Sequence, residues 1–290
     1  MIRSLTGTGV WSSTLRHSAP AEIADAAAEL ESLGYSALWI PDVGGDVFGA
    51  VDNLLAATTA AIVATGILNL WMHPAEEAAA RHAALTAQYG QRFLVGIGIS
   101  HSHLVDRAVA EGAYRQPLAR TREYLDALDA AEVPLAVADR ALAALGPRML
   151  ELAATRTAGV HPYLVTPEHT RIAREAVGPD ALVATEQGVV LETDPDRARS
   201  IARDNLSRYL ELPNYTNNWK RLGFTDDDLQ GGGSNRLVDA LVAWGDSSTI
   251  AARIGEHRDA GAGHVCVQVL TDTPRTMPLD QWRRLAPVLI

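Results

Sequence analysis

The sequence predicts a single (β/α)8 TIM barrel that spans residues 1–290. Short apolar runs alternate eight times with alanine-rich stretches of helical period, and this alternation indicates parallel strands joined by crossover helices. The chain length is also that of one such barrel. A doubly wound open sheet is disfavoured because no GxGxxG loop follows the first strand, which ends in Val10-Trp-Ser-Ser13.

The expected strands are short runs of β-branched, aromatic and aliphatic residues bounded by turn residues. In chain order they cover 5–12, 37–40, 64–70, 93–99, 140–145, 160–164, 182–190 and 264–270. The stretches between them predict helices over 20–33, 51–61, 74–89, 118–131, 147–155, 167–177 and 248–260, with a closing segment at 279–285. Gly34 ends the first helix and Pro74 begins the third, in the positions that glycine and proline favour.

The segment at about 194–246, after the seventh strand, is too long for one crossover and predicts an insertion. Within it, 213–219 and the glycine-rich 231–234 indicate loops between additional helices. Long loops at this end of a barrel often cover the mouth. We therefore expect the insertion to act as a lid or to meet a partner subunit.

Charge and composition exclude several function classes. The formal net charge of −10 disfavours binding to nucleic acid or to an acidic membrane surface, which needs a basic patch. Lys220 is the only lysine, so a Schiff-base mechanism is disfavoured, and Cys266, the only cysteine, rules out a disulfide within the chain. We find no signal peptide and no apolar stretch of membrane-spanning length, and expect a cytoplasmic protein that acts on a small molecule.

The fourth expected strand carries the strongest functional signal, because its apolar run ends in glycine, serine and histidine. Gly96 and Gly98 have no side chain, so a flat ligand can lie against the strand with His101 beside it. Removal of hydride from an alcohol carbon needs a base for the hydroxyl proton, and imidazole titrates near neutral pH. His101 is therefore the candidate catalytic residue; the alternative is a ring that only binds the cofactor or shapes the pocket.

Active-site residues of TIM barrels lie at the carboxyl ends of the strands. These ends are rich in histidine and aromatic residues and poor in paired carboxylates. They supply Trp11, Ser12, Pro41, Asp42, Asn69, Trp71, His73, Ser100, His101, His103, 144–148, 161–163 and, if the seventh strand ends early, Glu186 and Gln187.

Several motifs together resemble one known family. They are Gly34-Tyr-Ser-Ala-Leu-Trp-Ile-Pro-Asp42, Thr65-Gly-Ile-Leu-Asn-Leu-Trp71, His73-Pro-Ala75, Gln91-Arg-Phe-Leu-Val-Gly-Ile-Gly-Ile-Ser-His101 and Ala143-Ala-Leu-Gly-Pro-Arg148. In this order they resemble the luciferase-like flavin and deazaflavin oxidoreductases. The serine–histidine pair after the fourth strand and the last motif after the fifth are most similar to the coenzyme F420-dependent branch.

This resemblance implies a homodimer in which each barrel binds a deazaflavin ring across the strand ends and passes hydride at the ring's C5. By position, Asp42 meets the polar edge of the ring or its side chain, Gly66 and Ile67 form a bulge with a cis peptide behind the ring, and 98–101 lies beside it. The cofactor-binding residues so implied are Asp42, Gly66, Ile67, Asn69, Gly98, Ile99, Ser100, His101, Leu145, Gly146, Pro147 and Arg148.

The last four of these residues fall where the family holds the cofactor phosphate, and elementary chemistry agrees. A helix N-terminus attracts a phosphate, Gly146 lets it come close, and Pro147 at the first helical position sacrifices no needed donor. Arg148 adds a charged fork. The alternative is a plain strand-to-helix turn with a solvated arginine.

Two features bear on the substrate. Val43 stands where the family's sugar-phosphate dehydrogenase has a histidine, and cations for a sugar phosphate are lacking. Aromatic residues predict instead a largely apolar alcohol, ketone or enone, with Trp11 and Trp71 as substrate contacts and Phe48 and Trp219 as further members of the rim.

Three alternatives remain open. FMN with molecular oxygen is the nearest, since both rings fit similar pockets, and would make the chain a luciferase-like monooxygenase. His101 and His103 project to the same side of an extended segment, so a metal-dependent hydrolase or lyase is the second, with His73, His161 and Asp42 as further ligands. The third is a barrel that binds without catalysis.

Overall fold

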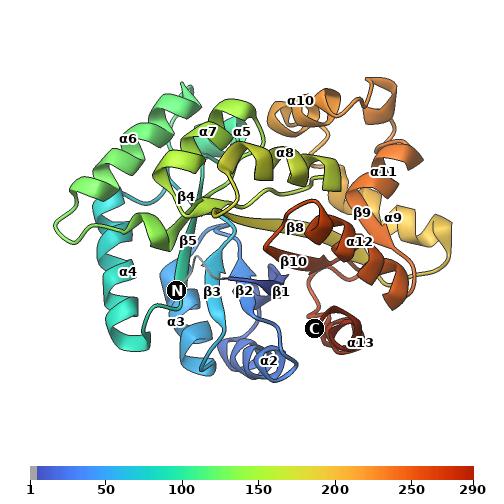
Figure 1. Ribbon diagram of the computed structural model, residues 1–290, viewed down its shortest axis with the longest axis horizontal. Coiled ribbons are helices and arrows are strands. Elements are labelled where there is room, and N and C mark those ends of the chain that lie inside the picture. The colour runs from blue at the N-terminus through green and yellow to red at the C-terminus, as the bar shows by residue number, and fades with distance from the viewer. Residues whose placement is uncertain (1–4) are drawn as a thin grey trace.

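The computed structural model describes residues 5–290, apart from the side chains of His103, Leu104 and Ala108 (Figure 1). In this range eight parallel strands close into a barrel, which confirms the predicted fold class. They are β1 (Gly7–Trp11), β2 (Ala37–Ile40), β3 (Ile62–Thr65), β5 (Phe93–Gly98), β6 (Arg140–Leu142), β7 (Gly159–Val160), β8 (Leu182–Val190) and β10 (His264–Val269). The ring closes because His264 of β10 is in register with Gly7 of β1 on one side and with Ala184 of β8 on the other.

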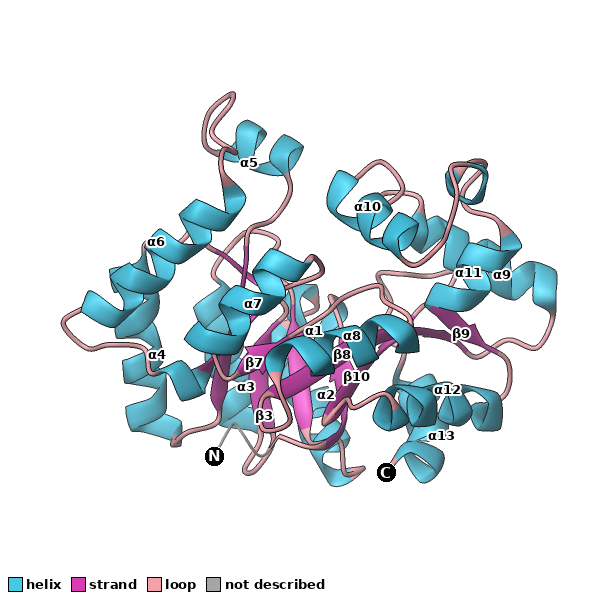
Figure 2. Cartoon of the chain, turned by 45° about the horizontal axis from the view of Figure 1, so that its top comes forward, coloured by secondary structure: helices cyan, strands magenta, loops and turns pink. Residues whose placement is uncertain are grey.

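Helices surround the barrel, as Figure 2 shows, and most begin where the sequence predicts. Those outside the insertion are α1 (Thr14–His17), α2 (Pro20–Ser32), α3 (Val47–Ala57), α4 (Ala75–Tyr89), α5 (Ser102–Ala108), α6 (Pro117–Ala130), α7 (Pro147–Arg156), α8 (Pro167–Val177), α12 (Ser247–Asp259) and α13 (Leu279–Leu289). Proline stands at a first helical position in α2, α6, α7 and α8, where its missing N–H removes no helical hydrogen bond. The second expected helix starts earlier than expected, at Val47, because the Asp46 side chain accepts a hydrogen bond from the Gly49 N–H and caps it.

The third expected strand is interrupted at the point where the resemblance implied a bulge. It divides into β3 and the short β4 (Leu68–Asn69), and the Gly66–Ile67 peptide bond between them is cis. β4 then pairs with the end of β5 rather than continuing β3 directly, with Leu68 opposite Ile97. The expected bulge is confirmed.

The insertion is helical and corrects one prediction. It contains α9 (Pro195–Leu206), α10 (Pro213–Arg221), α11 (Asn235–Leu241) and β9 (Val242–Trp244), so 213–219 is part of a helix and not a loop. Tyr215 and Trp219 are one helical turn apart, their ring centroids lie 5.9 Å from each other, and both are buried. This apolar stripe packs α10 on a second hydrophobic cluster, which explains why a polar, asparagine-rich segment is helical.

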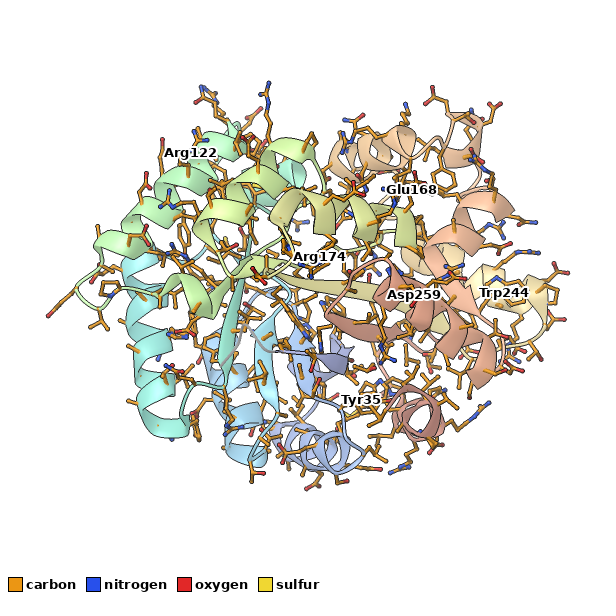
Figure 3. All side chains as sticks on the ribbon, in the orientation of Figure 1. Tyr35, Arg122, Glu168, Arg174, Trp244 and Asp259 are labelled. Atoms are coloured by element: carbon orange, nitrogen blue, oxygen red, sulfur yellow. The ribbon has the colours of Figure 1, made fainter. Side chains whose placement is uncertain are left out.

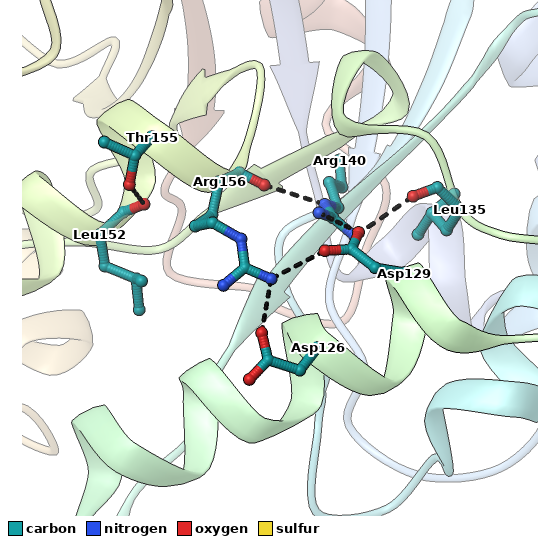
Figure 4. A network of polar contacts seen from close by, with 7 residues as sticks. All are labelled: Asp126, Asp129, Leu135, Arg140, Leu152, Thr155 and Arg156. Atoms are coloured by element: carbon teal, nitrogen blue, oxygen red, sulfur yellow. Dashed lines mark hydrogen bonds and ion pairs between the residues drawn. The ribbon is translucent and has the colours of Figure 1, made fainter.

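A buried arginine fixes the position of α7. Arg140, fully buried at the start of β6, donates to Asp129 Oδ1 of α6 at 2.7 Å, to the Leu135 carbonyl and to the Arg156 carbonyl at the end of α7 (Figure 4). Arg156 in turn donates to Asp126 and Asp129. Each donor of a buried guanidinium needs such partners, so this network ties β6 to α6 and α7 at the end remote from Gly146.

Charged side chains such as Arg122 and Glu168 project from the outer helices, while Tyr35 lies buried beside α13 (Figure 3). The Tyr35 hydroxyl donates to the Trp282 carbonyl at 2.9 Å and so joins the chain's C-terminal helix α13 to the loop after α2. Within residues 5–290, no helix combines the length and apolar character needed to cross a bilayer.

Candidate functional site

A cavity of about 770 Å³ opens at the carboxyl ends of the barrel strands. Residues that end or follow every barrel strand except β8 line it, and α9 and α10 of the insertion form one side. In Figure 2, α5 and α10 stand above the barrel at this end. The geometry is that of TIM-barrel active sites, which are built from the loops after the strands.

Glycines shape the floor of the cavity. A Cβ added to Gly98 would collide with the side chain of Ile67, so its absence lets Ile67 lie against the end of β5. A Cβ on Gly66 would lie 2.5 Å from the Trp11 Nε1 and 2.9 Å from the His161 Nε2. Gly96, predicted to face a ligand as well, does not line the cavity: its missing side chain makes room for the Thr65 carbonyl of β3, a strand-packing role.

Asp42 is anchored at the cavity's edge by two donors. Its Oδ2 accepts the backbone N–H of Asn69 at 3.0 Å and lies 3.0 Å from His73 Nε2. The Asn69 side chain accepts the Trp71 N–H and does not line the cavity. The Asp42 carboxylate, expected to meet the polar edge of a cofactor ring or its side chain, is thus held in one orientation.

The N-terminus of α7 reaches the cavity through Gly146, its N-cap residue, and Leu145. Pro147 and Arg148 are exposed and do not line the cavity. The arginine that faces this point is Arg221 of α10, whose Nη2 lies 3.7 Å from the position of a Cβ at Gly146. The structure therefore brings a different cation to the helix N-terminus than the sequence predicted, since Arg148 projects outward from the first turn of α7.

His101 precedes α5 as its N-cap residue and lines the cavity. Ser100, before it, has a left-handed backbone with a φ of 57°, which turns the chain away from β5. The His101 ring faces Tyr215 of α10 with centroids 5.7 Å apart. The imidazole is thus placed between the strand end and the insertion.

Two buried titratable groups lie in the barrel interior near the cavity. Burial raises the pKa of Glu186 in β8 to about 8, although its Oε2 accepts the Leu164 N–H. Burial lowers the pKa of His161 to about 4, although its Nδ1 donates to the Ala184 carbonyl at 2.8 Å. Both groups are neutral near pH 7, as burial without an ion-pair partner requires. Glu186 and Gln187 do not line the cavity, because β8 continues to Val190.

Most predicted cofactor residues meet in this one space. Those that line the cavity are Asp42, Gly66, Ile67, Gly98, Ile99, Ser100, His101, Leu145 and Gly146, together with the predicted substrate contact Trp11. Those that do not are Asn69, Pro147, Arg148 and Trp71.

Three of the predicted rim aromatics pack elsewhere. The Trp71 indole donates to the Ile99 carbonyl at 2.9 Å and stacks under Arg120, outside the cavity. Phe48 packs in the core against Phe93, and Trp219 is fully buried with its indole N–H on the Leu164 carbonyl. Large aromatic residues bury more area in a core than at a rim, which is why sequence alone misplaces them.

The structure joins Tyr163, which was expected at a strand end, with lining residues that were not predicted. Tyr163, Tyr209 and Tyr215 form an aromatic wall of the cavity, and Gln268 of β10 and Arg221 of α10 also line it. Only the position of Gln268 near the end of the last strand was a usable signal. Tyr209, Tyr215 and Arg221 come from the insertion, whose length predicted a cover over the mouth but not which of its side chains would face the cavity.

The described residues supply no metal site. Among them no group of three or more histidine, cysteine, aspartate or glutamate side chains could hold a metal ion. His103, named as a ligand together with His101, has its side chain outside the described residues. His73 and Asp42 contact each other, whereas His161 is bound to a backbone carbonyl.

Residues 1–135 match the family of luciferase-like monooxygenases. A search of curated proteins gives no match. The resemblance to luciferase-like oxidoreductases is therefore confirmed by the family match over the first part of the barrel.

Solved structures similar to this chain include oxidoreductases with two kinds of cofactor. An F420-dependent secondary alcohol dehydrogenase, in complex with an F420–acetone adduct, has a TM-score of 0.76 at 13% identity, over 98% of each chain. The coenzyme F420-dependent tetrahydromethanopterin reductase from Methanopyrus kandleri has a TM-score of 0.75 at 18% identity, over 98% of this chain and 99% of the other. The oxygenating constituent of 3,6-diketocamphane monooxygenase from Pseudomonas putida, in complex with FMN, has a TM-score of 0.68 at 14% identity, over 98% and 97%. These likenesses show the fold.

Proposed function

We propose that this luciferase-like barrel is an F420-dependent oxidoreductase that transfers hydride between the deazaflavin and a neutral, largely apolar alcohol, ketone or enone. The observation that carries the proposal is one cavity that His101, the glycine-shaped floor and the α7 N-terminus all line. A redox reaction of this kind needs a planar slot, an anchor for an anionic tail and a proton-transfer group, and these three features supply them.

The residues of the floor fit a flat heterocycle. Gly66 and Gly98 have no side chains, and the side chains of Ile67, Trp11 and His161 lie directly beside them. Asp42 offers a carboxylate oriented by His73 and Asn69, which suits the N–H groups at the polar edge of such a ring. When bound, the deazaflavin supplies a hydride donor or acceptor at its C5.

The anionic tail of the cofactor would be held at Gly146. The N-terminus of α7, a helix of ten residues, directs its partial positive charge there, and Arg221 adds a full charge at the cavity mouth. The missing side chain of Gly146 permits close approach of a phosphate. The same position would hold the phosphate of either ring cofactor.

His101 would transfer the substrate proton. In alcohol oxidation, the carbon–hydrogen bond breaks with its electron pair leaving as hydride, and the imidazole accepts the hydroxyl proton. In the reverse direction, the imidazolium donates that proton to the carbonyl oxygen. The adjacent Tyr215 ring excludes water from one side of the imidazole, which favours direct proton transfer to the substrate.

FMN is the second candidate cofactor, because an FMN-bound monooxygenase shares the fold. We test the choice by titrating the purified protein with F420 and with FMN and following fluorescence quenching. Tight binding of F420 with weak or no binding of FMN supports the proposal, whereas micromolar binding of FMN alone overturns the cofactor assignment. Failure of both to bind overturns the proposed function itself.

We also infer a homodimer from the family resemblance. Sedimentation equilibrium of the purified chain would measure a mass of twice 31.0 kDa if this holds, and a monomer mass contradicts it.

A further inference from the structure

We propose that Gln268 and Tyr163 form a polar subsite within the aromatic wall that binds a second oxygen atom of a flat, neutral ketone or alcohol. The inference rests on the proposed function, since it places the reacting oxygen at His101. It adds the substrate class: an aromatic or cyclic compound that carries a second carbonyl or hydroxyl group remote from the reacting one.

The wall that would hold the ring of the substrate is continuous. Tyr163, Tyr209 and Tyr215 have ring centroids 5.0 to 6.3 Å from one another, and Trp11 lies 5.5 Å from Tyr163. His101 adjoins this wall at Tyr215, and Gln268 adjoins it at Tyr163. Aromatic surfaces of this kind bind flat rings by stacking and edge contacts. A substrate along the wall therefore has His101 toward one end and Gln268 toward the other.

The hydrogen bonds of the wall fix how Gln268 is presented. The Tyr163 hydroxyl donates to Gln268 Oε1 at 2.8 Å, and the Tyr209 hydroxyl lies 3.1 Å from that of Tyr163. Because Tyr163 has a single proton and gives it to Gln268, Tyr209 is the donor in the second bond. Burial raises the pKa of Tyr163 well above its ordinary value, so this hydroxyl stays protonated and keeps donating.

The amide N–H of Gln268 is available to a ligand. Its Nε2 donates to no acceptor among residues 5–290, and Gln268 is only half-buried and lines the cavity. Gln187, on the neighbouring strand β8, provides the contrast within the same barrel. Its Nε2 donates to the carbonyls of Gly188 and Leu241, its Oε1 bonds His257, and it is fully buried. Gln187 is thus a structural amide, whereas Gln268 keeps an N–H donor for an oxygen acceptor.

The chemistry of this subsite selects a neutral group. The N–H donor of Gln268 and the hydroxyls of Tyr163 and Tyr209 carry no charge. The buried carboxyl group of Glu186, which interacts with both tyrosines, is neutral because burial raises its pKa to about 8. Gln268 offers a carboxylate or phosphate only one neutral donor in place of its hydration shell, which is unfavourable. Arg208, a cation that lines the same cavity, lies over the Tyr209 ring, 5.9 Å from its centroid. A carbonyl, ether or hydroxyl oxygen satisfies the single donor.

The test compares two probes of nearly equal shape, 1,4-diacetylbenzene and 4-isopropylacetophenone. Both are flat aromatic ketones, and only the first has a second carbonyl oxygen. Binding to the wild-type protein is measured by isothermal titration calorimetry, with and without F420. We expect the diketone to bind about threefold to tenfold more tightly, the range for one neutral hydrogen bond. Equal affinities for the two probes overturn the subsite.

Two variants test which side chains cause the preference for the diketone. Q268L should abolish the preference for the diketone while leaving the affinity for 4-isopropylacetophenone within about twofold, because only one hydrogen bond is removed. Y163F keeps the ring of the wall but frees the amide to rotate, so it should reduce the preference without abolishing it. A preference that persists in Q268L overturns the role of Gln268, and Q268E serves in its place if the leucine variant does not fold.

The outcome is separable from that of the proposed function. The probes bind the wall whether or not the protein uses F420, so a diketone preference without cofactor binding would support the subsite and contradict the proposed function. Cofactor binding without a preference for the diketone would support the proposed function and contradict the subsite.

Discussion

The imidazole of His73 lies 3.0 Å from the carboxylate of Asp42, Nε2 to Oδ2, although only Asp42 lines the cavity. The same oxygen accepts the N–H of Asn69, so the carboxylate is fixed from two directions. His73 in turn packs edge-on against Phe48 in the core. A side chain outside the site therefore orients a side chain within it, as outer-shell partners commonly do in binding sites.

His73→Phe tests this relationship. The variant keeps the packing on Phe48 but removes the nitrogen that holds Asp42, so we expect the Kd for the ring cofactor to rise about threefold to tenfold. Fluorescence titration measures it. Met72→Ala, at an exposed neighbouring position, should leave the Kd unchanged. Unaltered affinity in His73→Phe would show that Asp42 does not contact the cofactor.

His101→Ala should lower turnover by about 10² or more while cofactor affinity stays within about tenfold, because general acid–base catalysis contributes on that scale. Steady-state kinetics with an oxidisable alcohol and separate cofactor titrations measure the two effects. Ser102→Ala, at the adjacent exposed position, serves as the control. Turnover that does not change removes His101 from the mechanism.

Gly98→Ala should weaken cofactor binding by about tenfold or more, because the new Cβ collides with Ile67 and pushes that side chain into the slot. Gly255→Ala is the matched control. Its Cβ meets nothing within 4 Å in the exposed part of α12, so it should keep cofactor affinity and gain stability of up to about 1 kcal/mol from helix propensity. Thermal unfolding and titration of both variants separate binding from folding. Normal affinity in Gly98→Ala would contradict a ligand on this floor.

Arg221→Ala should raise the Kd for F420 about fivefold, the modest effect of an exposed ion pair, and should leave binding of its phosphate-free chromophore unchanged. Arg148→Ala, at the position that the sequence predicted, should have little effect because its side chain is exposed and does not line the cavity. If FMN is the cofactor instead, the same comparison applies to FMN and riboflavin, which lacks the phosphate. A larger loss in Arg148→Ala than in Arg221→Ala would reverse the assignment.

Glu186 should make the protein less stable as the pH rises. Its pKa is raised from 4.5 to about 8 in the folded chain, so the native state retains a proton that the unfolded state releases within this window. The free energy of unfolding should fall by up to about 1.4 kcal/mol per pH unit there.

At lower pH, buried histidines have the opposite effect on the free energy of unfolding. Burial lowers the pKa of His161 from 6.5 to about 4, so its contribution is lost as the pH falls below 6.5. Urea unfolding between pH 6.5 and pH 8 therefore isolates Glu186, and Glu186→Gln should flatten the slope. An equally steep slope in the variant would mean that Glu186 ionises normally.

The barrel and most strand positions can be predicted from the sequence because both depend on local pattern. β2 and α8 have the expected bounds, since apolar runs and the proline at the start of α8 are local signals. Gly98 and His101, predicted from the pattern at the end of β5, both line the cavity. Arg148 and Trp71 do not line the cavity, because the direction of a side chain from a helix or loop depends on neighbours distant in sequence.

The alternation of strands and helices, the glycines at the strand ends and the position of His101 follow from the order of residues along the chain. Whether Arg221 or Arg148 faces Gly146, and how three tyrosines and Gln268 form one wall, was decided only when α9 and α10 folded over the barrel. These contacts join segments such as Tyr163 and Gln268, which lie 105 positions apart. Burial of the second hydrophobic cluster drives that packing, and the energy of such packing is a property of the assembled surface rather than of any local stretch of sequence.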